Sequence, residues 1–233
     1  MAIVFLNESH SFPALGNATS DGLLAVGGDL SPERLLKAYA NAIFPWYSDD
    51  LPIMWWSPDP RMVLFPEKFK ISKSLKHLIR KDTFTVKFDT CFEDVIQLCQ
   101  KVTRKGQNGT WITSELMEAF TILHKMGYAH SVETFLSEKL VGGLYGLSHG
   151  GIFFGESMFQ KESNASKVAL YYLTVFLKKH NFDLIDVQQE TKHLKSLGAE
   201  LMPRNMFKKT VDESLNKPTL VGKWDKNFDN EEK

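Results

Sequence analysis

Cysteine is scarce in this chain of 233 residues. Its two cysteines, Cys91 and Cys99, do not form the close pairs typical of a disulfide framework or a zinc knuckle. Helical spacing places Cys99 on one apolar face with Phe92, Val95 and Ile96, which predicts buried free thiols in a reducing compartment. Charge of either sign is also not in excess, because 28 basic residues balance 28 acidic ones. Any contact with nucleic acid would therefore need a local basic patch.

Long hydrophobic runs are missing as well. The start, MAIVFLNESH, is a short apolar stretch without a basic lead, typical neither of a signal peptide nor of a membrane span. The ATP-binding pattern GxxxxGK[ST] does not occur, which removes the simplest case for ATP use. The 43% of hydrophobic residues can bury one full core with a smaller flanking domain. We therefore expect a soluble cytoplasmic protein that does not contact a membrane.

The first sixty residues hold many glycines, prolines and aromatic residues. One short helix is predicted there, capped by Ser31 and begun by Pro32. The stretches IFPWY and PIMWWSPDPR carry three tryptophans on irregular backbone, where an exposed ring is costly unless it packs or binds. Packing of a small domain onto a larger one explains Trp55 and Trp56 as well as binding does. For Trp46, binding is the better interpretation.

From about residue 70 the pattern becomes regular. Ser72 to Arg80 reads as a helix, and a capping box of Thr90 and Glu93 predicts a helix to about residue 102. A further helix begins at Thr113. The remaining expected elements are a strand at 84–88, three strands near 130–136, 139–147 and 151–155, a helix from 163 or 164 to 180, a strand at 182–188, a short helix, a short strand and a last helix from about 205.

The resulting order βααβββαβαβα predicts an α+β fold with a mixed sheet. It resembles the acyltransferase fold of the GCN5-related N-acetyltransferases. Those enzymes hold the pyrophosphate of acetyl-CoA on a glycine-rich turn before the long helix, whereas FQKESNASK contains no glycine here. We expect a small N-terminal domain at 1–62, an acetyltransferase-like catalytic domain at 63–222 and a mobile tail at 223–233.

Polar side chains occur where the core should be apolar. Asp186 and Gln188 lie two apart on a predicted strand, hence on one face, with Ile185 and Val187 opposite. Glu156 directly follows another strand. A satisfied structural pair is the alternative to a reactive site, but an isolated buried carboxylate is costly unless it has partners.

The chain resembles a known family in the order and spacing of its stretches LLAVGGDLSPERLLKAY, IFPWY, PIMWWSPDPR, GTWIT, LVGGLYG, FFGESMF, NASK, LIDVQ and HLKSLGAELMPR. These are similar to the leucyl/phenylalanyl-tRNA–protein transferases from about Gly22 to Phe207. The resemblance implies transfer of Leu, Phe and less often Met from aminoacyl-tRNA to proteins that begin with Arg or Lys, marking them for N-degron proteolysis. It implies no metal and no cofactor, and we expect a monomer.

The resemblance also implies roles for individual residues. Asp186, Gln188 and Glu156 match the groups at the reacting amine. The aromatic residues that hold the 3′-terminal adenosine are matched by Trp46 and Trp111, with Tyr39 nearby. The side-chain pocket is matched by Leu144, Phe153, Met158, Leu170, Leu173, Leu177 and Ile185. Two positions depart from the family: Phe120 replaces a usual tyrosine, and Ala42 a usual glycine, so that Asn41 is expected to take a positive φ instead.

The reaction needs neither ATP nor metal, because an aminoacyl ester is already activated. The site must hold a neutral α-amine, accept a proton and stabilise an oxyanion. A neutral amide is not a base at pH 7, so Gln188 is interpreted as the acceptor that aims the amine and Asp186 as the group that orients it. Glu156 either assists at the amine or recognises the Arg or Lys cation.

A local basic patch does exist, in residues 68–81. On the helix expected there, positions 73, 76 and 80 share one face suited to phosphates, and the expected tRNA contacts are Lys73, Lys76, His77, Arg80 and Lys81. The alternative is that these basic residues only face solvent and bind no tRNA. Two other functions stay open at this point: a CoA-dependent N-acyltransferase and a non-catalytic tRNA-binding module.

Overall fold

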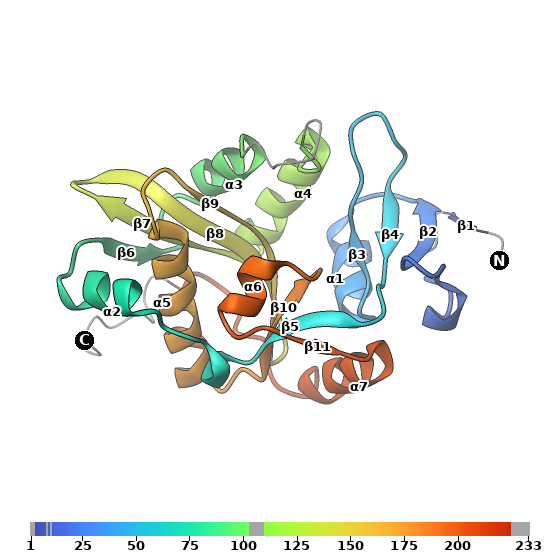
Figure 1. Cartoon of the computed structure of the whole chain (residues 1–233). Coiled ribbons are helices and arrows are strands. Elements are labelled where there is room, and N and C mark those ends of the chain that lie inside the picture. Colours follow the sequence, from blue (N-terminus) through green and yellow to red (C-terminus); the bar gives the residue numbers. More distant parts are fainter. Residues whose placement is uncertain (1–2, 8, 10, 103–109, 225–233) are drawn as a thin grey trace.

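The computed structural model describes residues 3–7, 9, 11–102 and 110–224, which form two sheets (Figure 1). The smaller sheet has four strands in the order β1-β2-β4-β3. It consists of β1 (Val4–Leu6), β2 (Leu23–Gly27), β3 (Phe44–Pro45) and β4 (Met54–Trp56), accompanied by α1 (Pro32–Ala40) and the 3-10 turn η1 (Leu15–Asn17). This unit stands beside one end of the larger sheet.

The larger sheet has seven strands in the order β11-β5-β10-β9-β8-β7-β6. Its strands are β5 (Arg61–Leu64), β6 (Thr85–Phe88), β7 (Ala129–Leu136), β8 (Lys139–His149), β9 (Ile152–Gln160), β10 (Leu184–Gln188) and β11 (Glu200–Met202). Only β9 and β10 pair in parallel; the other neighbours are antiparallel. The sheet is therefore mixed, as the sequence predicted.

Helices cover both faces of this sheet. They are η2 (Pro66–Lys68), α2 (Lys73–Arg80), α3 (Phe92–Gln100), α4 (Ser114–Lys125), α5 (Ala165–Lys179), α6 (Lys192–Ser196) and α7 (Arg204–Ser214). One hydrophobic core joins α3, α4 and α7 to the N-terminal sheet, and the other joins α2 and α5. Successive residues of β8 point into different cores, Leu144 into the second and Tyr145 into the first.

The order from β6 to α7 is βααβββαβαβα, which confirms the predicted α+β class. Thr113 caps α4 as expected, accepting a hydrogen bond from the Leu116 N–H. The predicted capping box before α3 is wrong, because Cys91 occupies the N-cap and makes no side-chain cap. The Thr90 hydroxyl donates instead to the buried carboxylate of Glu133, at 3.1 Å. A buried carboxylate needs such donors more than a helix end does.

The end of α1 also differs from expectation. Ala42 has φ 61°, whereas Asn41 has φ −104°, so the prediction that Asn41 takes the left-handed conformation is wrong. The Ala42 N–H donates to Tyr39 and the Ile43 N–H to Ala38, at 3.0 and 2.9 Å. This pair of bonds closes a helix only when the first of the two donor residues, here Ala42, is left-handed. Hydrogen bonding thus decides the conformation against the usual preference of alanine.

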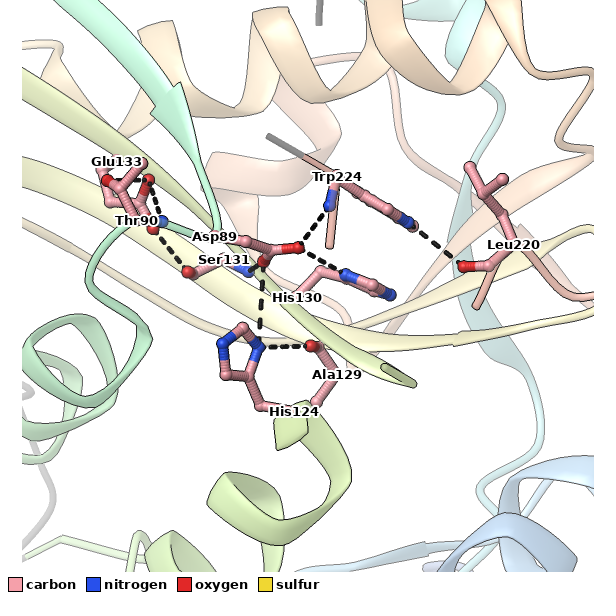
Figure 2. Close-up of polar contacts among 9 residues, drawn as sticks. All are labelled: Asp89, Thr90, His124, Ala129, His130, Ser131, Glu133, Leu220 and Trp224. Carbon is pink, nitrogen blue, oxygen red and sulfur yellow. Dashed lines mark hydrogen bonds and ion pairs between the residues drawn. The ribbon is translucent and has the colours of Figure 1, made fainter. Parts of the chain in front are cut away.

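Trp224, the last described residue, belongs to a buried polar cluster (Figure 2). Asp89 accepts hydrogen bonds from His130 Nδ1 and from the backbone N–H of Ser131, both at 2.8 Å, and from the Trp224 N–H at 2.9 Å. The Trp224 ring stacks on His130 at 3.7 Å and is fully buried. Burial lowers the pKa of His130. The expected mobile tail is thus wrong for Trp224, and residues 225–233 lie outside the described residues.

The division into domains stays a prediction. The expected boundary between residues 62 and 63 falls inside β5, which already belongs to the larger sheet. Among the helices in the described ranges, none has both the length and the apolar character needed to cross a bilayer.

Candidate functional site

The site lies where the two parallel strands of the large sheet separate. Pairing between β9 and β10 ends at Phe154 and Asp186, yet β9 continues to Gln160 and β10 to Gln188. Across this gap, the side-chain amide of Gln188 donates to Glu156 Oε1 at 3.4 Å. Two residues that the family resemblance had grouped thus meet in the gap from different strands.

Both of these residues lie beside irregularities in strand pairing. In β9, the pairing with β8 shifts between Gly155 and Ser157, which leaves Glu156 as the extra residue. In β10, the pairing with β5 shifts between Asp186 and Gln188, and Gln188 has φ 55°. A β-bulge redirects the side chains next to it. The prediction that Asp186 and Gln188 share one face is therefore wrong, since strict alternation does not hold there.

A pocket of about 390 Å³ occupies the gap. Ten of the predicted site residues line it: Trp46, Trp111, Leu144, Phe153, Glu156, Met158, Leu170, Leu173, Ile185 and Gln188. Four others, Tyr39, Phe120, Leu177 and Asp186, do not. The lining also includes residues that the sequence did not single out, namely Phe44, Pro45, Tyr145, Gly155, Ser157, Val187, Gln189, Thr191, His193 and Leu194.

The unpredicted lining residues carry only weak sequence signals. Phe44 and Pro45 belong to the IFPWY stretch that had been singled out for its tryptophan. Gln189, Thr191 and His193 are exposed residues of the segment from β10 into α6 and form a polar rim. Nothing in their own spacing reveals this position, which depends on how β10 ends.

Glu156 sits in the pocket wall, half-buried, with two donors. The fully buried Tyr39 hydroxyl donates to Glu156 Oε1 at 2.7 Å, from α1 behind the pocket. The pKa of Glu156 is raised to about 8, because removal from water and, to a lesser extent, the nearby Asp186 carboxylate outweigh the Tyr39 hydrogen bond and the Arg61 charge, which lower it. Tyr39 thus reaches the site through Glu156.

Phe120 and Leu177 have packing positions. The Phe120 ring is edge-on to Tyr39 at 6.5 Å and to Tyr145 at 5.5 Å. Its lack of a hydroxyl is therefore accommodated in an aromatic cluster behind the pocket. Leu177 is buried in the core between α5 and the sheet.

Asp186 is fully buried and bound to a residue that the sequence analysis missed. Arg61 donates from Nε and Nη2 to its two carboxylate oxygens, each at 2.8 Å. A usable signal was present, because Arg61 opens an otherwise apolar strand, RMVL, and a buried arginine needs an anionic partner.

The tryptophans fall into two groups, one buried in the packing and one in the pocket wall. Trp55 is fully buried and its indole N–H donates to the Gly27 carbonyl at 2.8 Å, which is a packing role. Trp46 and Trp111 are half-buried in the pocket wall. The Trp56 indole N–H donates to the Trp46 carbonyl at 2.6 Å, and the two rings meet edge-on at 5.5 Å. Trp56 therefore supports Trp46.

The basic residues of the predicted tRNA contact are exposed on α2 and the residue after it. Lys73, Lys76, His77, Arg80 and Lys81 all face solvent, and none forms an ion pair within the part of the chain described. Helix α2 packs against α5, whose Leu170 and Leu173 line the pocket. The cations therefore lie on an element next to the pocket wall.

Comparison with known proteins gives one consistent result for sequence. Residues 63–212 match the family model described as leucyl/phenylalanyl-tRNA protein transferase, and residues 28–59 match that of its N-terminal domain. The chain is 53% identical over 224 residues to the leucyl/phenylalanyl-tRNA--protein transferase of Syntrophus aciditrophicus, covering 96% of this chain and 94% of that one. A relative of the same name from Desulfatibacillum aliphaticivorans is 52% identical, covering 96% of both chains.

Solved structures are much more distant. An aminoglycoside acetyltransferase from a soil metagenome is 12% identical with a TM-score of 0.36, covering 50% of this chain and 84% of that one. A GCN5-related N-acetyltransferase from Kribbella flavida is 10% identical with a TM-score of 0.34, covering 70% of this chain and 57% of that one. Scores this low carry no argument about function.

Proposed function

The chain belongs to the leucyl/phenylalanyl-tRNA protein transferase family, and on that premise we propose that it moves Leu or Phe, and less often Met, from aminoacyl-tRNA to the α-amine of proteins that begin with Arg or Lys. The products would enter N-degron proteolysis. The observation that carries the proposal is the pocket itself: an apolar cavity with one carboxylate, Glu156, and the amide of Gln188 facing each other at its edge, flanked by two tryptophans.

The apolar wall suits the transferred side chain. Leu144, Phe153, Leu170, Leu173 and Ile185 are all buried and surround the cavity, so an unbranched polar side chain would lose its hydration without gaining partners. The cavity volume of about 390 Å³ falls within the range of small-ligand pockets. Specificity would therefore rest on apolar fit.

Glu156 is the group that we propose accepts the first proton. Its pKa of about 8 is close to the ~7.7–8.0 of an α-amine, and matched values make the transfer between them nearly neutral in free energy. Gln188 would present its side-chain oxygen to the amine, because its amide nitrogen already donates to Glu156. The other role considered, recognition of the Arg or Lys cation, would leave the amine without a proton acceptor.

The transfer step then balances without a cofactor. The amine nitrogen attacks the ester carbonyl carbon, a C–N bond forms, and the bond from that carbon to the adenosine 3′-oxygen breaks. The ammonium group gives up two protons. Glu156 takes the first and passes it to solvent, and the second moves to the leaving 3′-oxygen, with the adenosine 2′-hydroxyl as its carrier.

One assay tests the function. The protein is mixed with labelled Phe-tRNA, labelled acetyl-CoA and a peptide that begins with Arg, beside the same peptide beginning with Glu. We expect Phe on the Arg peptide only and no acetyl product. Acetyl transfer would instead support a CoA-dependent enzyme, and tRNA binding without any transfer would support a binding module.

Loss of a pocket tryptophan should weaken binding of the 3′-terminal adenosine. Base–aromatic stacking contributes roughly 1–3 kcal/mol per base, so Trp46→Ala or Trp111→Ala should lower the affinity for a puromycin-like aminoacyl-adenosine analogue about fivefold to a hundredfold. Isothermal titration measures this, with Phe5→Ala, an exposed ring on β1, as the control. Unchanged affinity in both tryptophan variants would leave these rings with a packing role only.

The basic residues of α2 should act as a phosphate clamp that does not read sequence. Replacing Lys73 and Arg80 together by Ala should weaken tRNA binding. It should also make the slope of log affinity against log salt concentration shallower, by the amount that about two phosphate contacts contribute. The control is Lys208→Ala with Lys209→Ala, two lysines of α7 paired with carboxylates. Titrations across salt measure both. If the α2 variant keeps the wild-type salt slope, residues 68–81 only face solvent and do not contact tRNA phosphates.

A further inference from the structure

Arg61 makes more contacts than a lone ion pair requires. It is 1% exposed, and in addition to its two bonds to Asp186 it donates from Nη1 to the Ala42 carbonyl at 3.2 Å. That carbonyl belongs to the left-handed residue that ends α1. Arg61 therefore links strand β5, strand β10 and the turn that leads into the pocket-lining segment Phe44–Trp46.

Aromatic rings hold the guanidinium in place. Its central carbon lies 4.6 Å from the centroid of the Phe44 ring and 4.8 Å from that of Phe207. Phe44 lines the pocket, whereas Phe207 comes from α7. A planar cation flanked by rings has little freedom to turn, so the direction of its bonds to Asp186 is fixed.

Both carboxylate oxygens of Asp186 already accept hydrogen bonds from the protein. Its Oδ2 accepts from Arg61, and its Oδ1 accepts both from Arg61 and from the backbone N–H of Gln188 at 3.0 Å. It is fully buried and does not line the pocket. Its third bond falls on Gln188, whose φ of 55° is unfavourable for a residue with a side chain. The carboxylate thus stabilises a strained backbone.

From these contacts we infer that Arg61 is a positioning residue of the transfer site. It acts through Asp186 to hold the Gln188 backbone in the conformation that directs the amide toward Glu156 and the amine. Asp186 is accordingly a buried support and not a proton acceptor. The inference rests on the proposed function, because the reaction that Arg61 supports is the proposed one. The contacts of Arg61 and Asp186 are observed whatever that reaction is.

This role needs arginine specifically, and another cationic side chain such as lysine would not serve. The guanidinium supplies two parallel donors to the carboxylate and a third to the carbonyl in one plane, and a lysine ammonium cannot reproduce that fork. Arg61→Lys therefore keeps the charge beside Asp186 and removes the fixed geometry. It also avoids leaving a buried carboxylate uncompensated, so the variant has the better chance to fold.

The test compares Arg61→Lys with Arg34→Lys. Arg34 is the matched control because it is likewise fully buried, pairs with Asp29 at 3.0 Å and donates to two backbone carbonyls, but lies in the N-terminal unit away from the pocket. Both variants should lower the melting temperature. Only Arg61→Lys should lower kcat, by about tenfold to a hundredfold, the range for a lost charge-assisted hydrogen bond. Its KM for Phe-tRNA should change less than about twofold, because the residue does not touch the nucleotide.

A double-variant cycle separates positioning from general damage. If Arg61 acts through Gln188, then Arg61→Lys should cost less than about twofold in a Gln188→Ala background, where no amide remains to be aimed. Equal losses in both backgrounds, full activity of Arg61→Lys, or an equal loss of kcat in Arg34→Lys would each overturn the inference. Failure of the wild-type protein to transfer Phe would instead refute the proposed function, and the two failures are therefore distinguishable.

Discussion

Glu156→Gln is expected to lower the rate of Phe transfer by at least about a hundredfold at pH 8.5, where most of the Glu156 carboxyl is ionised, because it removes the proposed proton acceptor while keeping the shape of the side chain and its bond from Tyr39. General base catalysis contributes typically 10²–10⁴-fold. Single-turnover kinetics with preformed Phe-tRNA measures the chemical step. Affinity for the aminoacyl-adenosine analogue should be nearly unchanged, since Glu156 serves the amine.

The same substitution should stabilise the fold at high pH. The pKa of Glu156 is raised from its ordinary 4.5 to about 8. Below pH 4.5 the carboxyl is protonated in both folded and unfolded chains and contributes nothing; as pH rises toward 8 only the unfolded chain loses the proton, so folding stability falls. Glu156→Gln removes that loss. Because Glu156 is only half-buried and solvent screens its charge, we expect a gain on the order of 2 kcal/mol at pH 8.5, below the roughly 5 kcal/mol that the full rise in pKa would give, and none at pH 4, measured by urea unfolding.

Glu133→Gln is the matched control for both readouts. Glu133 is a second buried carboxylate whose pKa burial raises, to about 7, and it lies outside the pocket among Ser131 and Thr90. It should gain stability at pH 8.5 in the same direction and keep the wild-type transfer rate. A Glu156→Gln variant that transfers Phe at full rate would end the assignment of Glu156 as the acceptor.

Asp186→Ala is expected to lose about 3–5 kcal/mol of folding stability, the cost of breaking a buried ion pair by removing one partner. The change leaves the Arg61 guanidinium, 1% exposed, without its carboxylate. Urea unfolding at pH 7 measures the loss. Activity should fall as well, because the Gln188 N–H loses its acceptor.

Gln188→Ala is the informative partner of that variant. Its side chain is half-buried at the pocket edge, so the stability cost should stay below about 1 kcal/mol. Turnover should nevertheless fall about a hundredfold or more, while tRNA binding is retained. An Asp186→Ala protein as stable as wild type would contradict the structural role of that carboxylate. A Gln188→Ala protein with normal turnover would contradict the reactive role of the amide.

Much of the fold followed from sequence pattern. Helical spacing and the Thr113 cap located α4, and the turn residues on either side of β8 located that strand. The strand expected at 151–155 was found but drawn too short, because β9 runs to Gln160 and Glu156 lies inside it. These elements are set by local hydrogen bonding and by which face is apolar, and both leave periodic signals. The apolar pocket residues were found through the family resemblance that their motifs carry.

The partners of the buried polar side chains could not be read from sequence pattern, because they are set by long-range contacts. The sequence placed Asp186 beside the reacting amine, but the tertiary structure turns it toward Arg61, 125 positions away. It also missed that Tyr39 reaches Glu156 across 117 positions and that Trp224 returns to Asp89. Buried charges and hydrogen-bond donors must find partners wherever the fold brings them. Sequence pattern thus determined most of the strands, and the family resemblance indicated the wall of the pocket. The pairing of buried polar groups, which only the packed chain settles, decided that Glu156 and not Asp186 lines that pocket.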